Sequence, residues 1–126
     1  MATMNVLTIQ SSVAHGHVGN SAATFALQRL GVTAWPVHTV QFSNHTGYAD
    51  WRGRAFALEE VAEVIAGIED RGVFPECDAV LSGYVTDAAT ARAATARAAA
   101  GAREVRLVEA QSEIAAPTHR LPARRI

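Results

Sequence analysis

The sequence predicts an α/β domain with a mostly parallel sheet of about four strands. Two observations carry this prediction. Short apolar, β-branched runs alternate along the chain with segments of helical periodicity, which is typical of parallel strands joined by helices. Polar and glycine residues follow the apolar runs, as expected where binding sites lie outside the carboxyl ends of parallel strands. With 126 residues, the chain is expected to form one domain, residues 1–126, with a core that needs no disulfide.

The first predicted unit consists of a strand, a glycine-containing loop and a helix. Asn5 to Ile9 is a short apolar run and predicts a buried strand. The polar stretch from Gln10 to Asn20 contains two glycines and is expected to be a loop. Asn20 or Ser21 is a suitable N-cap for the helix that follows, and Gly31 is expected to close it.

Two further strands and one helix are expected in the middle of the chain. Ala34 to Val40 predicts the second strand, starting near Val37 because Pro36 lacks a backbone donor. Apolar residues at positions 58, 61, 62, 65 and 68 share one face of a helix that ends near Gly72. Ala79 to Ser82 predicts the third strand.

The last third of the sequence is rich in alanine and then in polar residues. Asp87 can cap a third helix that continues to about Ala100, because alanine has the highest intrinsic helix propensity. Glu104 to Val108 alternates polar and apolar residues and predicts a fourth strand near an edge of the sheet. Two prolines and a short basic end predict a loosely held tail.

Composition excludes several classes of partner. The net charge is −1, from 11 basic and 12 acidic residues, so neither nucleic acid nor a membrane surface is expected as a partner. Cys77 is the single cysteine and is expected to be a small buried apolar residue. No apolar run reaches the roughly 20 residues that span a bilayer, and no signal sequence is recognisable at the start, which predicts a cytoplasmic protein.

A dense group of directional side chains occupies Val40 to Trp51, directly after the second predicted strand. This stretch is expected to be a binding loop at the mouth of the sheet. Two other polar segments, Gln10-Ser11 and Gly83-Tyr84, also follow predicted strands. Because the carboxyl ends of parallel strands meet at one edge, we expect the three segments to converge there.

The expected pocket combines a few polar groups with apolar walls. It would present the hydroxyls of Ser11 and Thr46, His45, the backbone of Gly47, and Tyr84, flanked by Val18, Val40 and Phe42. Such a set suits a flat, polar, partly aromatic small molecule.

Five segments of the sequence together resemble the amino-terminal third of bacterial pyridoxal kinases. The segments are Ile9 to Ser11, Gly16 to Ala23, Leu30 to Val32, Thr39 to Tyr48 and Cys77 to Tyr84. The resemblance implies a ribokinase-like three-layer fold and, for the family, ATP-dependent phosphorylation of pyridoxal to pyridoxal 5'-phosphate in vitamin B6 salvage.

The resemblance also implies roles for individual residues. Ser11, Thr46 and Gly47 would contact the substituents of the pyridoxal ring. The same pocket would be lined by Val18, Val40, Phe42, His45 and Tyr84. Two positions depart from the family pattern, since Ser12 replaces a usual histidine and His15 replaces a usual tyrosine.

The end of the chain resembles a different part of the same family. Residues from Glu104 onward are similar to its extreme carboxyl terminus, so residues 1–86 would form a substrate-side half and residues 99–126 a terminal strand and tail. The middle of the family fold, with its glycine-rich phosphate loop and catalytic aspartate, would then be missing. ATP and Mg²⁺ serve the family, but the sequence has no lysine and no Gly-x-x-x-x-Gly-Lys run to hold them.

This interpretation predicts a truncated ribokinase-like chain that binds pyridoxal or a related vitamer and has little or no kinase activity. No catalytic residue and no metal ligand is assigned. A homodimer is expected, because a shortened sheet exposes apolar edges and helix faces.

Three alternatives stay open. Zinc could be bound by histidines drawn from His15, His17, His38, His45 and His119. A serine hydrolase is less favoured, because Ser82-Gly83 lacks the leading glycine of a nucleophile elbow. A shortened relative could instead serve only as a vitamer-binding or dimerisation module.

Overall fold

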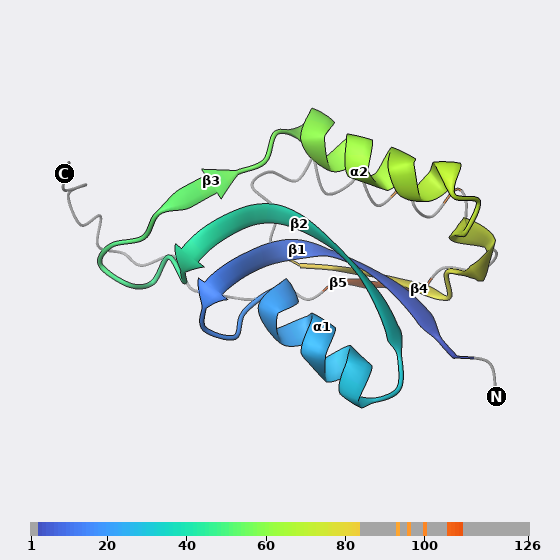
Figure 1. Cartoon of the computed structure of the whole chain (residues 1–126), viewed down its shortest axis with the longest axis horizontal. Helices are drawn as coiled ribbons and strands as arrows, with labels where there is room; N and C mark the ends of the chain where they lie inside the picture. Colours follow the sequence, from blue (N-terminus) through green and yellow to red (C-terminus); the bar gives the residue numbers. More distant parts are fainter. Residues whose placement is uncertain (1–2, 84–92, 94–95, 97–99, 101–105, 110–126) are drawn as a thin grey trace.

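The computed structural model describes residues 3–83, 93, 96, 100 and 106–109. Its middle layer is a sheet with the strand order β3-β2-β1-β4-β5 (Figure 1). The strands are β1 (Asn5–His15), β2 (Thr33–Asn44), β3 (Gly53–Ala55), β4 (Ala79–Ser82) and β5 (Arg106–Glu109). The helices are α1 (Asn20–Arg29), α2 (Leu58–Asp70) and the short 3-10 helix η1 (Phe74–Glu76).

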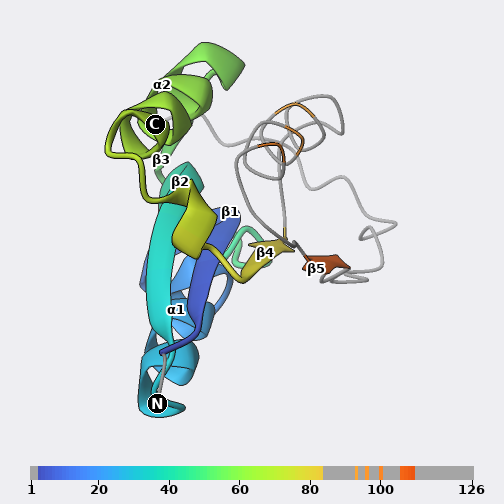
Figure 2. The ribbon, with the colours of Figure 1, turned by 90° about the vertical axis from the view of Figure 1, so that its right-hand side faces the viewer.

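The described strands confirm the predicted α/β class with a mostly parallel sheet. β1 pairs in parallel with both β2 and β4, and β4 pairs in parallel with β5. Only β3 runs antiparallel to its neighbour, β2, and it is the strand that the sequence did not predict. Figure 2 shows β2, β1, β4 and β5 in this order across the sheet.

The two long helices cover opposite faces of the sheet. Leu7 of β1 belongs to the main apolar cluster together with Val61 and Ile65 of α2. The next residue of β1, Thr8, instead donates its hydroxyl hydrogen to Asn20 of α1. Because successive side chains of a strand point to opposite faces, α1 and α2 lie on the two sides of β1, as Figure 1 shows.

β1 and β2 both extend beyond their predicted ends. The expected loop from Gln10 to Asn20 is wrong for its first part, because β1 continues to His15. The stretch after Val40 is likewise a strand as far as Asn44. Each strand provides the hydrogen-bonding partner of the other, with His15 opposite Asn44 at the end of the ladder. This mutual pairing outweighs the polar character of both segments.

The start of β2 also differs from the prediction. β2 begins at Thr33 rather than near Val37, and Pro36 lies within the ladder opposite Thr8. β3 pairs only with residues 40–42 of β2, so no described strand needs a donor from Pro36 on that side.

α1 begins one residue earlier than a cap at Asn20 would require. Gly19 occupies the N-cap position, with φ 55°, and no side chain caps the helix. The predicted capping roles of Asn20 and Ser21 are therefore wrong. Ser21 bonds β1 instead, because its hydroxyl donates to Val13 O at 2.6 Å and accepts from Val13 N at 3.0 Å. Gly31 follows the helix with φ 78°, as expected for a helix end.

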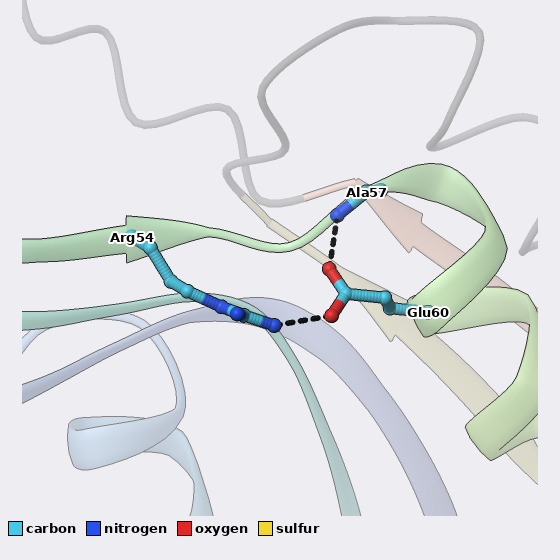
Figure 3. A network of polar contacts seen from close by, with 3 residues as sticks. All are labelled: Arg54, Ala57 and Glu60. Carbon is cyan, nitrogen blue, oxygen red and sulfur yellow. Dashed lines mark hydrogen bonds and ion pairs between the residues drawn. The ribbon is translucent and has the colours of Figure 1, made fainter.

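α2 confirms the predicted helical face, with Val61 and Ile65 buried. Glu60 fixes its start (Figure 3): one carboxylate oxygen accepts a hydrogen bond from Ala57 N at 2.8 Å, and the other pairs with the Arg54 guanidinium of β3. A carboxylate in this position satisfies an otherwise unpaired donor at the helix N-terminus.

The carboxyl-terminal part is described in pieces. β4 confirms the predicted strand at residues 79–82, and a strand follows near the predicted fourth strand, at residues 106–109. Ala93, Ala96 and Ala100 of the predicted third helix are helical and exposed. The remainder of that helix and the tail lie outside the described residues. Neither α1 nor α2 is long and apolar enough to cross a membrane.

Candidate functional site

The first and third polar segments of the predicted site converge at β1. Gly83 follows β4 and donates its N–H to Ile9 O at 3.0 Å. A Cβ atom placed on Gly83 would lie 2.3 Å from Gln10 Oε1, so the glycine backbone packs directly against that side chain. The expected convergence of these two segments is therefore observed. Tyr84, the next predicted site residue, lies outside the described residues.

A small apolar cluster lies at the carboxyl-terminal halves of β1 and β2. Val13, Val40 and Phe42 are buried there, and Val18 packs against them from the segment before α1. Val13 and Phe42 are neighbours in the β1–β2 ladder. Three of the predicted site residues thus lie together: Val40 and Phe42 on β2, and Val18 in the segment that joins β1 to α1.

Ser11 lies at an irregularity of the same ladder. Gln10 pairs with His38 and Ser12 pairs with Gln41, so two residues of β2 stand opposite Ser11 alone. A Cβ atom on Gly19 would lie 2.2 Å from Ser11 O and 2.3 Å from Ser11 Oγ. Only a glycine therefore allows the chain entering α1 to pass this close to Ser11.

His45, Thr46 and Gly47 form the start of the turn between β2 and β3, which we call the hairpin turn (residues 45–52). Gly47 N donates to His45 Nδ1 at 2.9 Å, and Tyr48 N donates to His45 O at 3.2 Å. Because Nδ1 accepts a hydrogen bond, the neutral His45 ring carries its proton on Nε2, which leaves Nε2 as a donor. The side chain of Thr46 is exposed, whereas His45 is partly buried.

Aromatic contacts fasten the hairpin turn to both strands. The rings of Phe42 and Trp51 have centroids 4.4 Å apart, and those of His15 and Tyr48 are 6.4 Å apart. Trp51 contacts the predicted site residue Phe42 but was not itself predicted as a site residue. Its position in the dense polar stretch after Val40 was the available signal.

A buried polar network between α1 and the sheet was also missed. Thr8 Oγ1 donates to Asn20 Oδ1 at 2.9 Å, and Gln10 Nε2 donates to Thr8 Oγ1 at 2.8 Å. Asn20 Nδ2 donates to Val37 O at 3.0 Å and lies 3.0 Å from His38 Nδ1. Burial lowers the pKa of His38, because the charged imidazolium loses hydration.

Cys77 confirms the prediction of a small buried apolar residue. It is part of the main apolar cluster, and its thiol donates to Ala79 O at 3.3 Å. Burial raises the pKa of the Cys77 thiol; backbone hydrogen bonds at Leu7 and Ala79 oppose this rise, and the charge of Asp78 adds to it. The thiolate is therefore disfavoured, as for an unreactive cysteine.

Backbone amides at the helix entry of α1 are bonded within the chain. Ser21 N donates to Val18 O at 3.1 Å, and Ala22 N and Ala23 N both donate to Gly19 O. These amides are therefore engaged within the chain and are not presented together to an anion. Among the described residues, no group of three or more His, Cys, Asp or Glu side chains is placed to hold a metal ion.

The sequence is similar to pyridoxal kinases, although no protein-family model matches it. It is 63% identical to a pyridoxal kinase of Rubrobacter xylanophilus over 84 residues, which are 67% of this chain and 29% of that protein. It is 61% identical to a pyridoxal kinase of Deinococcus radiodurans over 89 residues, which are 71% of this chain and 30% of that protein. The chain thus spans about three-tenths of the length of the curated relatives it matches.

Solved structures give the same result for the fold. The pyridoxal kinase of Trypanosoma brucei superposes with a TM-score of 0.76 and 32% identity, over 86% of this chain and 42% of that one. The pyridoxal kinase of Leishmania donovani, solved with ADP and pyridoxamine, gives 0.69 and 35% over 83% of this chain and 38% of that one. The chain is therefore a homologue of pyridoxal kinases over the matched residues and corresponds to a part of the pyridoxal kinase fold.

Proposed function

We propose that this chain is the substrate-side part of a pyridoxal kinase-like protein and binds pyridoxal or a related B6 vitamer. One observation carries the proposal. Within the 84 to 89 residues that are about 60% identical to pyridoxal kinases, Val18, Val40 and Phe42 form one apolar cluster at the ends of β1 and β2. The hairpin turn follows this cluster directly along β2.

The chemistry of these groups suits a pyridine ring with polar substituents. Val18, the partly exposed member of the apolar cluster, would meet a face of the ring, and the buried Val40 and Phe42 would form the wall behind it. Under the proposal, the hydroxyls of Ser11 and Thr46 and the backbone of Gly47 bind the ring substituents. His45 and Tyr84 line the same pocket, and His45 can donate from Nε2.

A solved relative supports the choice of ligand. The pyridoxal kinase of Leishmania donovani has been crystallised with ADP together with pyridoxamine and, separately, with pyridoxine. Because the sequence has no lysine and matches only about three-tenths of a pyridoxal kinase, we propose vitamer binding for this chain and little or no phosphorylation by the 126-residue polypeptide alone.

Vitamer titration tests the binding part of the proposal. Pyridoxal and pyridoxine are titrated into the purified chain and followed by ring absorbance. The chain has no lysine, so an aldehyde can form an imine only at the amino terminus, and pyridoxine, which has no aldehyde, controls for that reaction.

Two alanine variants and one matched control locate the binding. We expect Ser11→Ala and Thr46→Ala each to weaken binding by about tenfold, the effect of losing one hydrogen bond to the ligand. Thr33→Ala removes an exposed threonine at the other end of β2 and should leave affinity unchanged. Equal affinity in all four proteins would contradict the proposed site.

An ATP-dependent assay tests the second part. Pyridoxal, pyridoxine and pyridoxamine are supplied with ATP and Mg²⁺ to the 126-residue chain, and the phosphorylated product is measured. We expect no turnover above background. Turnover that Ser11→Ala abolishes would show that the chain carries a complete kinase site.

Exposed apolar side chains favour a second role as a dimerisation module. Phe25 of α1 is 67% exposed, and Leu30 at its end is 79% exposed. We propose that α1 takes part in a homodimer in which a second copy of the chain covers these two apolar side chains. Size-exclusion chromatography should give a dimer that Phe25→Ser converts to a monomer, and a monomeric unaltered chain would contradict this role.

A further inference from the structure

The base of the hairpin turn is closed by a side chain as well as by main-chain bonds. Ser43 N donates to Arg52 O at 2.7 Å, and Arg52 N donates back to Ser43 Oγ at 2.9 Å. The Ser43 hydroxyl then donates to Asn44 Oδ1 at 2.7 Å. A continuous run of hydrogen bonds therefore leads from the end of the turn to Asn44.

Asn44 spans the turn with the other end of its amide group. Its Nδ2 donates to Asp50 O at 2.9 Å and to His45 O at 3.2 Å. The two hydrogens of one amide thus hold carbonyls at both ends of the hairpin turn. The oxygen accepts from Ser43 at the same time, which fixes the orientation of the amide.

The turn is also tied to the apolar cluster. Trp51 lies in the hairpin turn, and its ring packs against Phe42, which belongs to the cluster. Asn44 follows Phe42 on β2 and closes the same segment by hydrogen bonds. Thr46 and Gly47 lie between these two attachments, on a segment held at both ends.

We infer that Asn44 is a positioning residue for the vitamer, acting through the hairpin turn; this rests on the proposed function. Asn44 holds Thr46 and Gly47 in their bound arrangement before the ligand arrives. A segment ordered in advance does not lose its conformational entropy on binding, so affinity is higher. The Asn44 amide itself is occupied by main-chain and Ser43 partners and does not need to touch the ring.

The ligand-free chain gives a first readout. Trp51 reports on the turn by its fluorescence when the second tryptophan is removed by Trp35→Phe. In this background, Asn44→Ala should shift Trp51 emission to the red and increase its quenching by acrylamide. Asn44→Asp should do the same, because the carboxylate can accept from Ser43 but cannot donate to the carbonyls of Asp50 and His45.

Vitamer affinity gives the second readout. Pyridoxine is titrated at a temperature well below the melting point of each protein, so a general loss of stability does not alter the result. Both Asn44 variants should weaken binding by about tenfold, for the two lost hydrogen bonds that order the turn. Asn5→Ala is the matched control: Asn5 Nδ2 donates to Glu76 O at 2.9 Å at the far end of β1, and its loss should not change affinity.

The outcomes separate the inference from the proposed function. Weaker binding and a loosened turn in the Asn44 variants, with Asn5→Ala unchanged, would support the positioning role. If the unaltered chain binds pyridoxine and the Asn44 variants bind it equally well, the inference is wrong while the proposed function stands. An unaltered chain that binds neither pyridoxine nor pyridoxal would overturn both.

Discussion

Asn20 joins α1 to two strands through one buried amide. Its oxygen accepts from Thr8 of β1, and its nitrogen donates to Val37 O of β2. The sequence offered a polar residue at a helix start, which usually indicates a cap. The buried role depends on strands that are distant in the sequence, so local pattern could not predict it. A buried amide with its partners supplied favours one alignment of helix and sheet.

We expect His38 to make the stability of the fold depend on pH. Burial lowers its pKa in the folded chain, so the unfolded chain binds a proton more readily as the pH falls below about 6.5. Neutral His38 therefore favours the folded chain fully above that pH, and this contribution to the free energy of unfolding is lost as the pH falls further. The free energy of unfolding in urea, measured between pH 7.5 and pH 5.5, should therefore decrease.

Two glutamine variants test whether His38 is the source of this pH dependence. His38→Gln should show a weaker decrease in unfolding free energy on acidification than the unaltered chain. His17→Gln, at an exposed position, should show the same decrease as the unaltered chain. An unchanged pH dependence in His38→Gln would contradict the assignment.

Gly19 should tolerate no side chain. A residue other than glycine would be strained at its φ of 55°. An added Cβ would also overlap the Ser11 carbonyl oxygen, at a distance of 2.2 Å. We expect Gly19→Ala to lower the free energy of unfolding by about 2 kcal/mol or more and to weaken vitamer binding, since Ser11 must move. Gly67→Ala on α2, where no atom lies within 4 Å of the added Cβ, should instead stabilise the chain by about 0.5 kcal/mol. Equal effects of both substitutions would contradict the packing at Gly19.

Helices and strands that are determined by their own sequence were predicted better than those that depend on pairing with a distant segment. α2 was predicted well because the apolar residues of its buried face recur at helical spacing within the segment itself, with Val61 and Ile65 one turn apart. The extra lengths of β1 and β2 depend on mutual pairing beyond the irregularity at Ser11, which no single segment reveals. The short β3 has three exposed residues and carries no apolar signal at all.

The start of α2 should depend on Glu60 as an acceptor more than on its charge. Glu60→Ala leaves Ala57 N without its partner and should lower the free energy of unfolding by about 1 kcal/mol. Glu60→Gln keeps an oxygen for that bond and loses only an exposed ion pair with Arg54, so a loss of about 0.5 kcal/mol or less is expected. Urea unfolding measures both, and Glu63→Ala on the same helix is the control. Equal losses in the two Glu60 variants would contradict this ranking.

For the whole molecule, the sequence led to the right fold class and to the pyridoxal kinase resemblance, which the comparisons bear out. The parallel sheet also brought Gln10 and Gly83 together as expected. The roles of individual site residues are proposals, and Tyr84 lies outside the described residues. Polar residues such as Ser11 and Thr46 leave no periodic pattern, so only their position after strands could indicate them.

Titration of the 126-residue chain with pyridoxine and pyridoxal is the most direct test of the proposed vitamer site. Saturable binding of both, weakened by Ser11→Ala and Thr46→Ala and unaffected by Thr33→Ala, is the result expected for a vitamer site at the ends of β1 and β2. Absence of saturable binding in a chain that melts cooperatively would contradict that site.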